Sequence, residues 1–371
     1  MTTQGAGGPR LACFLTPHGF GHAARASAVL TAVRARQPDA HFDVFTQTPE
    51  WFFADSVGAG AYTYHRLATD VGLAQITPIQ ADLDETARRL DVLLPFDPGL
   101  VDRLADQLVS AGCRLVLCDI AALGIAVGKA AGLPTVLVEN FTWDWIYAGY
   151  FDEAPRLRAH AETLRGLYAG ATYRVQTEPF CHPGPADLTT RPVARTPRES
   201  VLAVRRKLGL PARTKAVLLT MGGVQPRYGF LEALRAYRGV WFIIPGGGER
   251  WEQDDNLVRL PHHSPIYHPD LVNSCDAVIG KLGYSTLAEA YHAGVPYGFI
   301  RRPGFRESDV LGDYVAAHMP AVDVPEAAFD SGDWSAFLPR LLDLPRRAPA
   351  GPNGAAAIAD FILQRLAPAP A

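Results

Sequence analysis

The chain has 371 residues, of which 48% are hydrophobic and 20% are charged, and its formal net charge is -3. This length is too great for one ordinary hydrophobic core and predicts two domains, while the charge argues against a broad nucleic-acid-binding surface. No apolar run reaches the roughly 18 residues of a membrane span, and five cysteines at irregular spacing form neither a metal-binding nor a disulfide pattern. Because the N-terminus also lacks the apolar segment of a signal peptide, we expect a cytoplasmic protein. The sequence leaves open whether the protein forms a homodimer.

The first half of the chain alternates strand and helix patterns. Short apolar strands are predicted at residues 11–16, 42–46, 115–119 and 135–139, and helices at residues 23–34, 83–94, 100–111 and 121–131. This βαβ rhythm predicts a parallel sheet that helices cover on both faces. Ligands bind such sheets at the carboxyl ends of the strands. His22 and Asp119 both follow predicted strand ends, so both are candidates for a functional site.

A change of composition separates the two halves. Residues 183–198 contain several prolines and few large apolar side chains, which predicts a linker. The rhythm then restarts, with strands at residues 216–220, 240–244, 257–260, 277–279 and 297–300 and helices at residues 199–208, 230–237, 285–292 and 334–342. We therefore predict a first domain over residues 1–182, a second domain over residues 199–352, and a final helix and tail over residues 353–371.

The segment Lys281-Leu-Gly-Tyr-Ser-Thr-Leu-Ala-Glu-Ala290 joins a predicted strand to a predicted helix. Outward N–H groups and the helix dipole favour an anion at such a junction. Lys281 would lie at the mouth of the site, and Glu289 one to two turns inside the helix. A nucleoside diphosphate fits this pattern, with the carboxylate on the ribose hydroxyls. An ordinary strand–turn–helix with a glycine turn would carry the same residues.

A second segment, Pro17-His-Gly-Phe-Gly-His22, follows the first predicted strand. Taken together, the two segments resemble the GT-B glycosyltransferases, the superfamily of the UDP-glycosyltransferases and MurG. Residues 140–147 and 302–307 add a resemblance to the glycosyltransferase-like family that includes the N-terminal region of plant L-arabinokinases. The resemblance spans residues 11 to about 310. It implies an α/β GT-B fold of two Rossmann-like domains facing across a cleft, with the final helix packed back on the first domain.

The resemblance further implies an inverting glycosyltransferase that needs no metal or other cofactor. Its partners would be a nucleotide sugar of the UDP or dTDP type and a small-molecule acceptor. His22 is the candidate general base, because histidine titrates near neutral pH, and His18 on the same loop is a weaker alternative. Asp119 would fix the tautomer of His22. Alternatively, His22 caps the helix that follows it and Asp119 is the N-cap of the next one.

Donor binding is expected in the second domain. Lys281 stands where UDP-glycosyltransferases of plants and animals carry a histidine, and it keeps a cation for the diphosphate. Glu289 falls on their ribose-binding glutamate, whereas the Asp-Gln pair that holds the sugar is absent near Glu307. The predicted donor contacts are Gly222, Gly223, His262, His263, Lys281, Gly283, Tyr284, Ser285, Thr286, Glu289 and Glu307.

Acceptor binding is expected in the first domain, where aromatic residues follow a predicted strand end. Aromatic faces pack on sugar rings or flat aglycones, so we predict acceptor contacts at His18, Phe20, Phe141, Trp143 and Trp145. An interdomain core would have the same aromatic pattern. Two other functions stay open, a nucleotide-sugar epimerase and a catalytically silent sugar-nucleotide-binding module.

Overall fold

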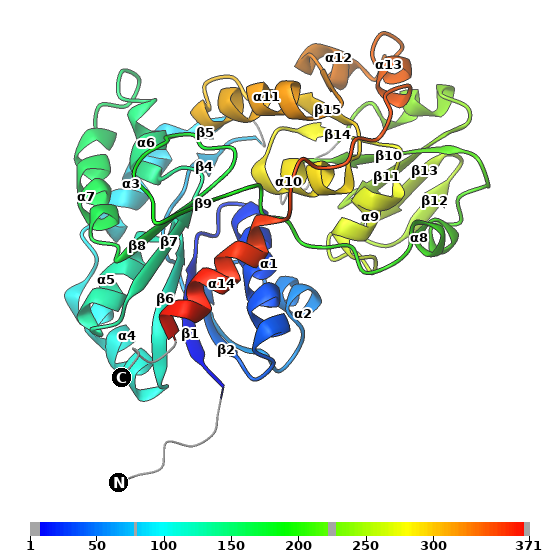
Figure 1. Ribbon diagram of the computed structural model, residues 1–371. Helices are drawn as coiled ribbons and strands as arrows, with labels where there is room; N and C mark the ends of the chain where they lie inside the picture. The colour runs from blue at the N-terminus through cyan, green and yellow to red at the C-terminus, as the bar shows by residue number, and fades with distance from the viewer. Residues whose placement is uncertain (1–7, 78–79, 222–227, 367–371) are drawn as a thin grey trace. The chain divides into compact units, whose positions relative to one another are not determined.

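A computed structural model describes residues 8–77, 80–221 and 228–366 (Figure 1). The chain forms two compact units. The first unit contains residues 1–76, 81–193 and 352–371, and the second contains residues 77–80 and 194–351. The chain thus passes into the second unit between residues 193 and 194, inside the segment that the sequence predicted as a linker.

The first unit is built on a seven-stranded sheet in the order β3-β2-β1-β6-β7-β8-β9, in which every neighbouring pair is parallel. The strands are β1 (Arg10–Leu15), β2 (His41–Thr46), β3 (Tyr62–Arg66), β6 (Cys113–Asp119), β7 (Thr135–Glu139), β8 (Tyr173–Thr177) and β9 (Leu188–Thr190). A two-stranded sheet of β4 (Ala74–Gln75) and β5 (Ala81–Asp82) accompanies it. The central strands are almost entirely buried, as expected for parallel strands that helices cover on both faces.

The helices of the first unit are α1 (Gly21–Arg36), α2 (Glu50–Ser56), α3 (Leu83–Leu93), α4 (Pro98–Ser110), α5 (Ala122–Ala130), α6 (Trp143–Ala148), α7 (Leu157–Ala169) and α14 (Gly354–Leu366). Helix α14, which closes the chain, packs against α1 (Figure 1). Its Ile358 and Ile362 join Leu11 of β1 and Leu30 of α1 in one buried apolar cluster. The last helix therefore completes the core of the first unit.

The second unit repeats this plan with a sheet in the order β12-β13-β11-β10-β14-β15-β16, parallel except for β12. Its strands are β10 (Lys215–Thr220), β11 (Val240–Pro245), β12 (Glu252–Asp254), β13 (Leu257–Leu260), β14 (Ala277–Lys281), β15 (Tyr297–Ile300) and β16 (Ala321–Asp323). Its helices are α8 (Val201–Lys207), α9 (His268–Ser274), α10 (Tyr284–Ala293), α11 (Arg306–His318), α12 (Glu326–Ser331), α13 (Leu338–Leu342) and the 3₁₀ helix η1 (Leu231–Ala236). Two separate apolar clusters fill the space between this sheet and its helices.

The α/β class and the two parallel sheets that the sequence predicted are confirmed. Two helix predictions need correction, because residues 230–237 form a 3₁₀ turn and the helix predicted from residue 334 begins only at Leu338. In the latter case the Asp333 side chain accepts hydrogen bonds from Ser335, which holds a turn ahead of the helix. Strand β8 escaped prediction because two of its three buried residues, Gln176 and Thr177, are polar and interrupt the apolar run.

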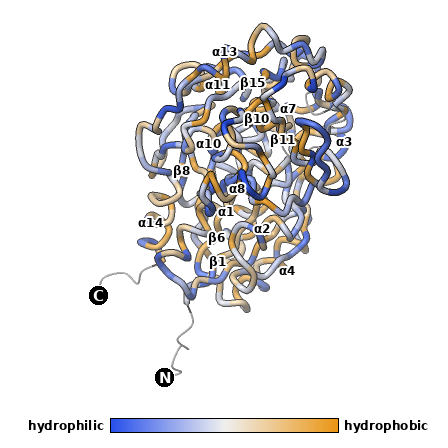
Figure 2. The backbone as a smooth tube through the Cα atoms, turned by 90° about the vertical axis from the view of Figure 1, so that its right-hand side faces the viewer, coloured by the Kyte–Doolittle hydropathy of each residue, from blue (hydrophilic) through white to orange (hydrophobic). Residues whose placement is uncertain are grey.

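Hydrophilic residues gather on surface helices such as α3 and α8, as Figure 2 shows. All five cysteines are buried free thiols. Within the described ranges, no helix combines the length and the apolar character that crossing a membrane requires.

Candidate active site

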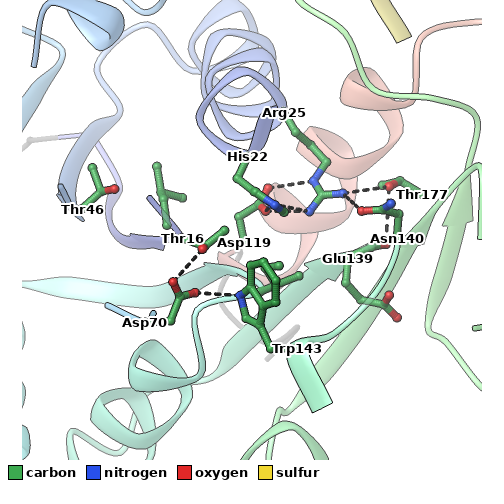
Figure 3. Close-up of polar contacts among 12 residues, drawn as sticks. Thr16, His22, Arg25, Thr46, Asp70, Asp119, Glu139, Asn140, Trp143 and Thr177 are labelled. Atoms are coloured by element: carbon green, nitrogen blue, oxygen red, sulfur yellow. Dashed lines mark hydrogen bonds and ion pairs between the residues drawn. The ribbon is translucent and has the colours of Figure 1, made fainter. Parts of the chain in front are cut away.

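The loop after β1 brings His22 to the carboxyl-end edge of the first sheet. Gly19, with a φ of +70°, supplies a left-handed turn that other residues rarely adopt, and α1 then begins at Gly21. The register of β1 and β6 pairs Leu15 with Asp119, so the two strands end side by side. Nδ1 of His22 lies 2.8 Å from Oδ1 of Asp119 (Figure 3). The parallel register therefore joins two residues that the sequence placed at separate strand ends.

Neither residue is a helix cap. The N-cap position of α1 is Phe20 and that of α5 is Ala121, and neither helix start has a side-chain cap hydrogen bond. Between Asp119 and α5, the β-branched Ile120 has a φ of 45°, a costly conformation that is concentrated at functional sites. The capping alternatives for His22 and Asp119 are therefore excluded.

Arg25 completes the cluster, and the sequence analysis missed it. It follows His22 by three residues, so both side chains lie on the same face of α1. Nε of Arg25 donates to Oδ2 of Asp119 at 2.8 Å, and Nη2 donates to Oδ1 at 2.6 Å. Nη1 donates to Oδ1 of Asn140 at 2.7 Å. With 1% of its surface exposed, Arg25 forms a buried bidentate ion pair with Asp119.

This ion pair sets the protonation of the site. Burial alone raises the pKa of Asp119, but the charge and hydrogen bonds of Arg25, together with the His22 hydrogen bond, outweigh burial and hold that pKa below its usual value. Asp119 is therefore a carboxylate and accepts the hydrogen bond. Nδ1 of His22 carries the proton, which leaves the Nε2 lone pair as the proton acceptor.

A second buried carboxyl, Asp70, lies near this cluster. Oγ1 of Thr16 donates to Oδ1 of Asp70 at 2.7 Å, and Nε1 of Trp143 donates to Oδ2 at 3.1 Å (Figure 3). Burial raises the pKa of Asp70 to about 7, the two hydrogen bonds oppose this shift, and the charge of Asp119 adds to it. Asp70 stands between β3 and β4 in a stretch without regular periodicity, so no sequence signal identified it.

The aromatic residues predicted for the acceptor lie in different surroundings. Phe141 and Trp143 are buried against the His22 ring, with ring centroids 5.7 and 6.4 Å from it. Phe20 packs instead on Trp51 and Phe52. Trp145 is half-buried on α6. Phe141 and Trp143 therefore form the apolar surroundings of the imidazole.

A cavity of about 800 Å³ opens beside the loop that follows β1 in the first unit. Of the residues predicted to contact the acceptor, only His18 is among its lining residues, and Asp70 contributes a carboxyl. The other lining residues are Pro17, Gly19, Gln47, Ala68, Val71, Leu73, Ala74, Gln75, Glu85, Arg88, Arg89, Val92 and Leu93. The cavity thus has a largely polar and charged wall in addition to an apolar one.

In the second unit, β14 leads into α10 through the predicted anion motif. Gly280 is required there, because a Cβ atom would lie 1.8 Å from the carbonyl oxygen of Thr220 on the neighbouring β10. Lys281 is the last residue of β14, Gly283 is the N-cap residue and Tyr284 begins the helix. The amides of the first turn of α10 therefore lie at the carboxyl end of the sheet, the arrangement that favours an anion.

Lys281 has an unusual electrostatic environment. Burial lowers the pKa of Lys281 to about 7, with the positive charge of Arg302 adding to that effect and the negative charge of Glu307 opposing it. Glu307, on the first turn of α11, is itself buried. Two predicted donor residues, Lys281 and Glu307, thus lie within electrostatic reach of each other.

Glu289 is engaged with two partners, Arg195 and His268, that the sequence analysis did not identify. Nε and Nη2 of Arg195 lie 3.0 and 2.9 Å from its Oε1, and Nδ1 of His268 lies 2.7 Å from its Oε2. Burial raises the pKa of Glu289, but Arg195 and His268 outweigh burial and lower it. A ribose hydroxyl would have to add to these contacts or displace one of them.

The remaining predicted donor residues are dispersed. His262 and His263 follow β13, where His263 is exposed and burial, aided by His263, lowers the pKa of His262. Ser285 is half-buried and Thr286 is buried on the first turn of α10. Gly222 and Gly223 lie outside the described residues.

Replacing Arg25 by methionine should strip Asp119 of its buried counter-ion. Removing one partner of a buried pair costs about 3–5 kcal/mol, because the other charge stays buried and uncompensated. We expect the free energy of unfolding of the first unit to fall by this amount in urea denaturation. Arg36→Met is the matched control, since Arg36 lies on the same helix but pairs with the exposed Asp360, and it should cost less than about 1 kcal/mol. Equal losses of unfolding free energy in both variants would contradict the assignment of Arg25 as the buried counter-ion of Asp119.

Asp70 should make the stability of the first unit depend on pH. Between about pH 4 and pH 7 the folded state keeps a proton on Asp70 that the unfolded state loses, so the free energy of unfolding should fall as pH rises through this window. Asp70→Asn lacks this contribution. Its stability relative to the wild type should therefore rise by on the order of a few kcal/mol from pH 4.5 to 7.5 and then level off. Urea denaturation at a series of pH values measures this difference, and Asp102→Asn, at an exposed position, is the control. Parallel curves of unfolding free energy against pH for Asp70→Asn and the wild type would contradict the raised pKa of Asp70.

No protein-family model matches the chain. Over 361 residues the chain is 28% identical to the L-arabinokinase of Arabidopsis thaliana, in a match that covers 96% of this chain and 34% of that protein. The chain therefore spans about a third of the length of this curated relative.

Several solved structures with a similar arrangement are glycosyltransferases, at low sequence identity. The glycotransferase of kitacinnamycin has a TM-score of 0.66 and is 14% identical, with 97% of this chain and 100% of that chain covered. The calicheamicin glycosyltransferase CalG4 has a TM-score of 0.63 and is 15% identical, with 98% and 100% covered. The Arabidopsis thaliana protein UGT89C1, solved with quercetin, has a TM-score of 0.61 and is 14% identical, with 96% and 94% covered. The chain therefore has the GT-B fold of these glycosyltransferases.

Proposed function

We propose that the protein is an inverting glycosyltransferase that moves a sugar from a nucleoside-diphosphate sugar, of the UDP or dTDP type, to a small-molecule acceptor. The observation that carries the proposal is the hydrogen bond from Nδ1 of His22 to ionised Asp119 at the carboxyl-end edge of the first sheet. The GT-B fold supports it, because the similar solved structures are glycosyltransferases.

The first unit supplies the base. Nε2 of His22 takes the proton of an acceptor hydroxyl while its oxygen attacks the anomeric carbon, and the bond from that carbon to the diphosphate oxygen breaks. Asp119 keeps the proton on Nδ1 and stabilises the imidazolium that forms. Arg25 acts through Asp119, since its bidentate contact keeps the carboxylate ionised and in place. Arg25 is thus a positioning residue.

The second unit supplies the donor contacts. Lys281 and the amides of Ser285 and Thr286 at the start of α10 stabilise the departing diphosphate. Glu289 is assigned to the ribose, next to Arg195 and His268, which already contact it, and Glu307 is assigned to the donor sugar. In this proposal these residues, rather than a metal ion, stabilise the negative charge of the leaving group.

His22→Ala should lower kcat by about 10²- to 10⁴-fold, the usual contribution of a positioned base. Single-turnover transfer with saturating donor and any acceptor that the wild type glycosylates measures this step, and donor affinity should stay unchanged. Asp119→Asn should reproduce part of the loss. His41→Ala is the control, because His41 lies at the start of β2, the opposite edge of the same sheet.

Turnover of His22→Ala within a few-fold of the wild type would remove His22 as the base. Product analysis without acceptor separates transfer from epimerisation, because an epimerase converts the nucleotide sugar alone. Donor binding without turnover on any acceptor would identify a silent binding module.

Lys281 should take up a proton when it binds a diphosphate. At pH 8, above its pKa of about 7, the amine is mostly neutral in the free protein, and a bound diphosphate favours the ammonium. Calorimetry of UDP or dTDP in buffers of different ionisation enthalpy should show uptake approaching one proton at pH 8 and little at pH 6. Lys281→Met should lose the uptake and weaken UDP more than uridine.

Lys215→Met is the control, because Lys215 is an exposed lysine at the start of β10 that pairs with Asp276. It should leave both proton uptake and affinity unchanged. Loss of UDP and uridine affinity to the same extent in Lys281→Met would place Lys281 away from the phosphates.

A further inference from the structure

We infer that the cavity of the first unit binds a small polyhydroxylated molecule that carries one anionic group, a sugar acid or a sugar phosphate. The cavity is the space of about 800 Å³ between the loop after β1, the segment from β3 to β4, and α3. Its size is within the range of small-molecule sites. Only the naming of this molecule as the acceptor rests on the proposed function.

The absence of aromatic walls argues against a flat aglycone. Among the described residues that line the cavity there is no Phe, Tyr or Trp. Trp143 presents its indole N–H to Asp70 and is fully buried, so its faces are packed by other side chains. A planar aromatic ligand gains much of its affinity by stacking on aromatic rings, and this cavity has only the imidazole of His18 for that purpose.

The charged residues of α3 that line the cavity are two arginines and one glutamate. Arg88 and Arg89 both line the cavity and share one carboxylate, with Nη1 of Arg88 2.9 Å from Oε2 of Glu85 and Nε of Arg89 2.7 Å from Oε1. Two guanidinium groups against one carboxylate leave one positive charge. Each guanidinium has five N–H donors in a planar fork that matches a carboxylate or a phosphate. A second anion, supplied by a ligand, would balance this wall.

Groups that recognise hydroxyls line other parts of the cavity. Gln47 and Gln75 each offer a donor and an acceptor, and Asp70 and His18 add a carboxyl and an imidazole. Asp70 is 8% exposed and is fixed by Thr16 and Trp143, so it is held in one orientation. Its raised pKa lets it accept from or donate to a hydroxyl near neutral pH. Side chains such as Val71 and Leu73 leave an apolar patch for the C–H face of a sugar ring.

Calorimetric titration of the full chain without donor tests this inference separately from catalysis. The probes are glucose, galactose and mannose, the corresponding uronates, the corresponding 6-phosphates, and quercetin. We expect a uronate or a 6-phosphate to bind at least about tenfold more tightly than its parent hexose, the value of one charge-assisted hydrogen bond. The uronate and phosphate series distinguish the two kinds of anion.

Variants assign the binding to this cavity. Arg88→Gln together with Arg89→Gln should abolish the preference for the anionic sugar and leave the parent hexose within about twofold. Asp70→Asn should weaken the hexose and the anionic sugar alike. Arg103→Gln is the matched control, because Arg103 is an exposed arginine of α4 that pairs with Asp97 and does not line the cavity.

The inference is overturned if no anionic sugar binds, if the double variant weakens the parent hexose as much as the anionic sugar, or if quercetin binds and Asp70→Asn abolishes its binding. Transfer to a flat acceptor that depends on His22 would overturn this inference and leave the proposed function standing. Binding of an anionic sugar without transfer to it would support the inferred ligand class and overturn only its naming as the acceptor.

Discussion

The buried ion pair between Arg25 and Asp119 is the interaction on which the candidate site depends. Asp119 is the buried last residue of β6, where an unpaired carboxylate would take up a proton rather than stay charged. Arg25 meets both of its oxygens and has 1% of its surface exposed. The ion pair keeps the carboxylate ionised, and an ionised carboxylate can only accept a hydrogen bond. Nδ1 of His22 must therefore donate to it, which leaves Nε2 as the atom that can act as a base.

The same physics separates Asp119 from Asp70, two buried carboxyls of the candidate site. Asp119 and Asp70 are both buried, yet their pKa values move in opposite directions. Asp119 has a guanidinium against it, whereas Asp70 has only the neutral donors of Thr16 and Trp143. Neutral hydrogen bonds offset less of the desolvation cost than a full opposite charge does. Two carboxyls of one type thus take on different chemistry, one as a permanent anion and one as a group that changes charge near neutral pH.

The second unit shows the corresponding contrast between Glu289 and Lys281. Glu289 is buried inside α10 but has Arg195 and His268 on its two oxygens, and so it remains ionised. Lys281 is half-buried at the end of β14, and desolvation together with the like charge of Arg302 lowers its pKa to about 7. An anion that binds at the start of α10 would therefore favour protonation of Lys281, and the resulting ammonium would in turn stabilise the bound anion.

Local sequence alone predicted the central strands of both sheets and several of the helices that cover them, because burial on both faces of a parallel strand demands a continuous apolar run and a covering helix demands its own period. It also placed His22, Asp119 and the Lys281–Glu289 motif at strand ends, since strand ends are local. It did not reveal Arg25, whose partner Asp119 is 94 residues away along the chain, or Asp70 in a stretch without periodicity. Nor did it distinguish Phe141 and Trp143 beside the imidazole from residues that line the cavity. These were decided by the sheet order and register, because which side chains meet, and whether a charge is buried with a partner, depends on strands and helices that are neighbours only in the folded chain.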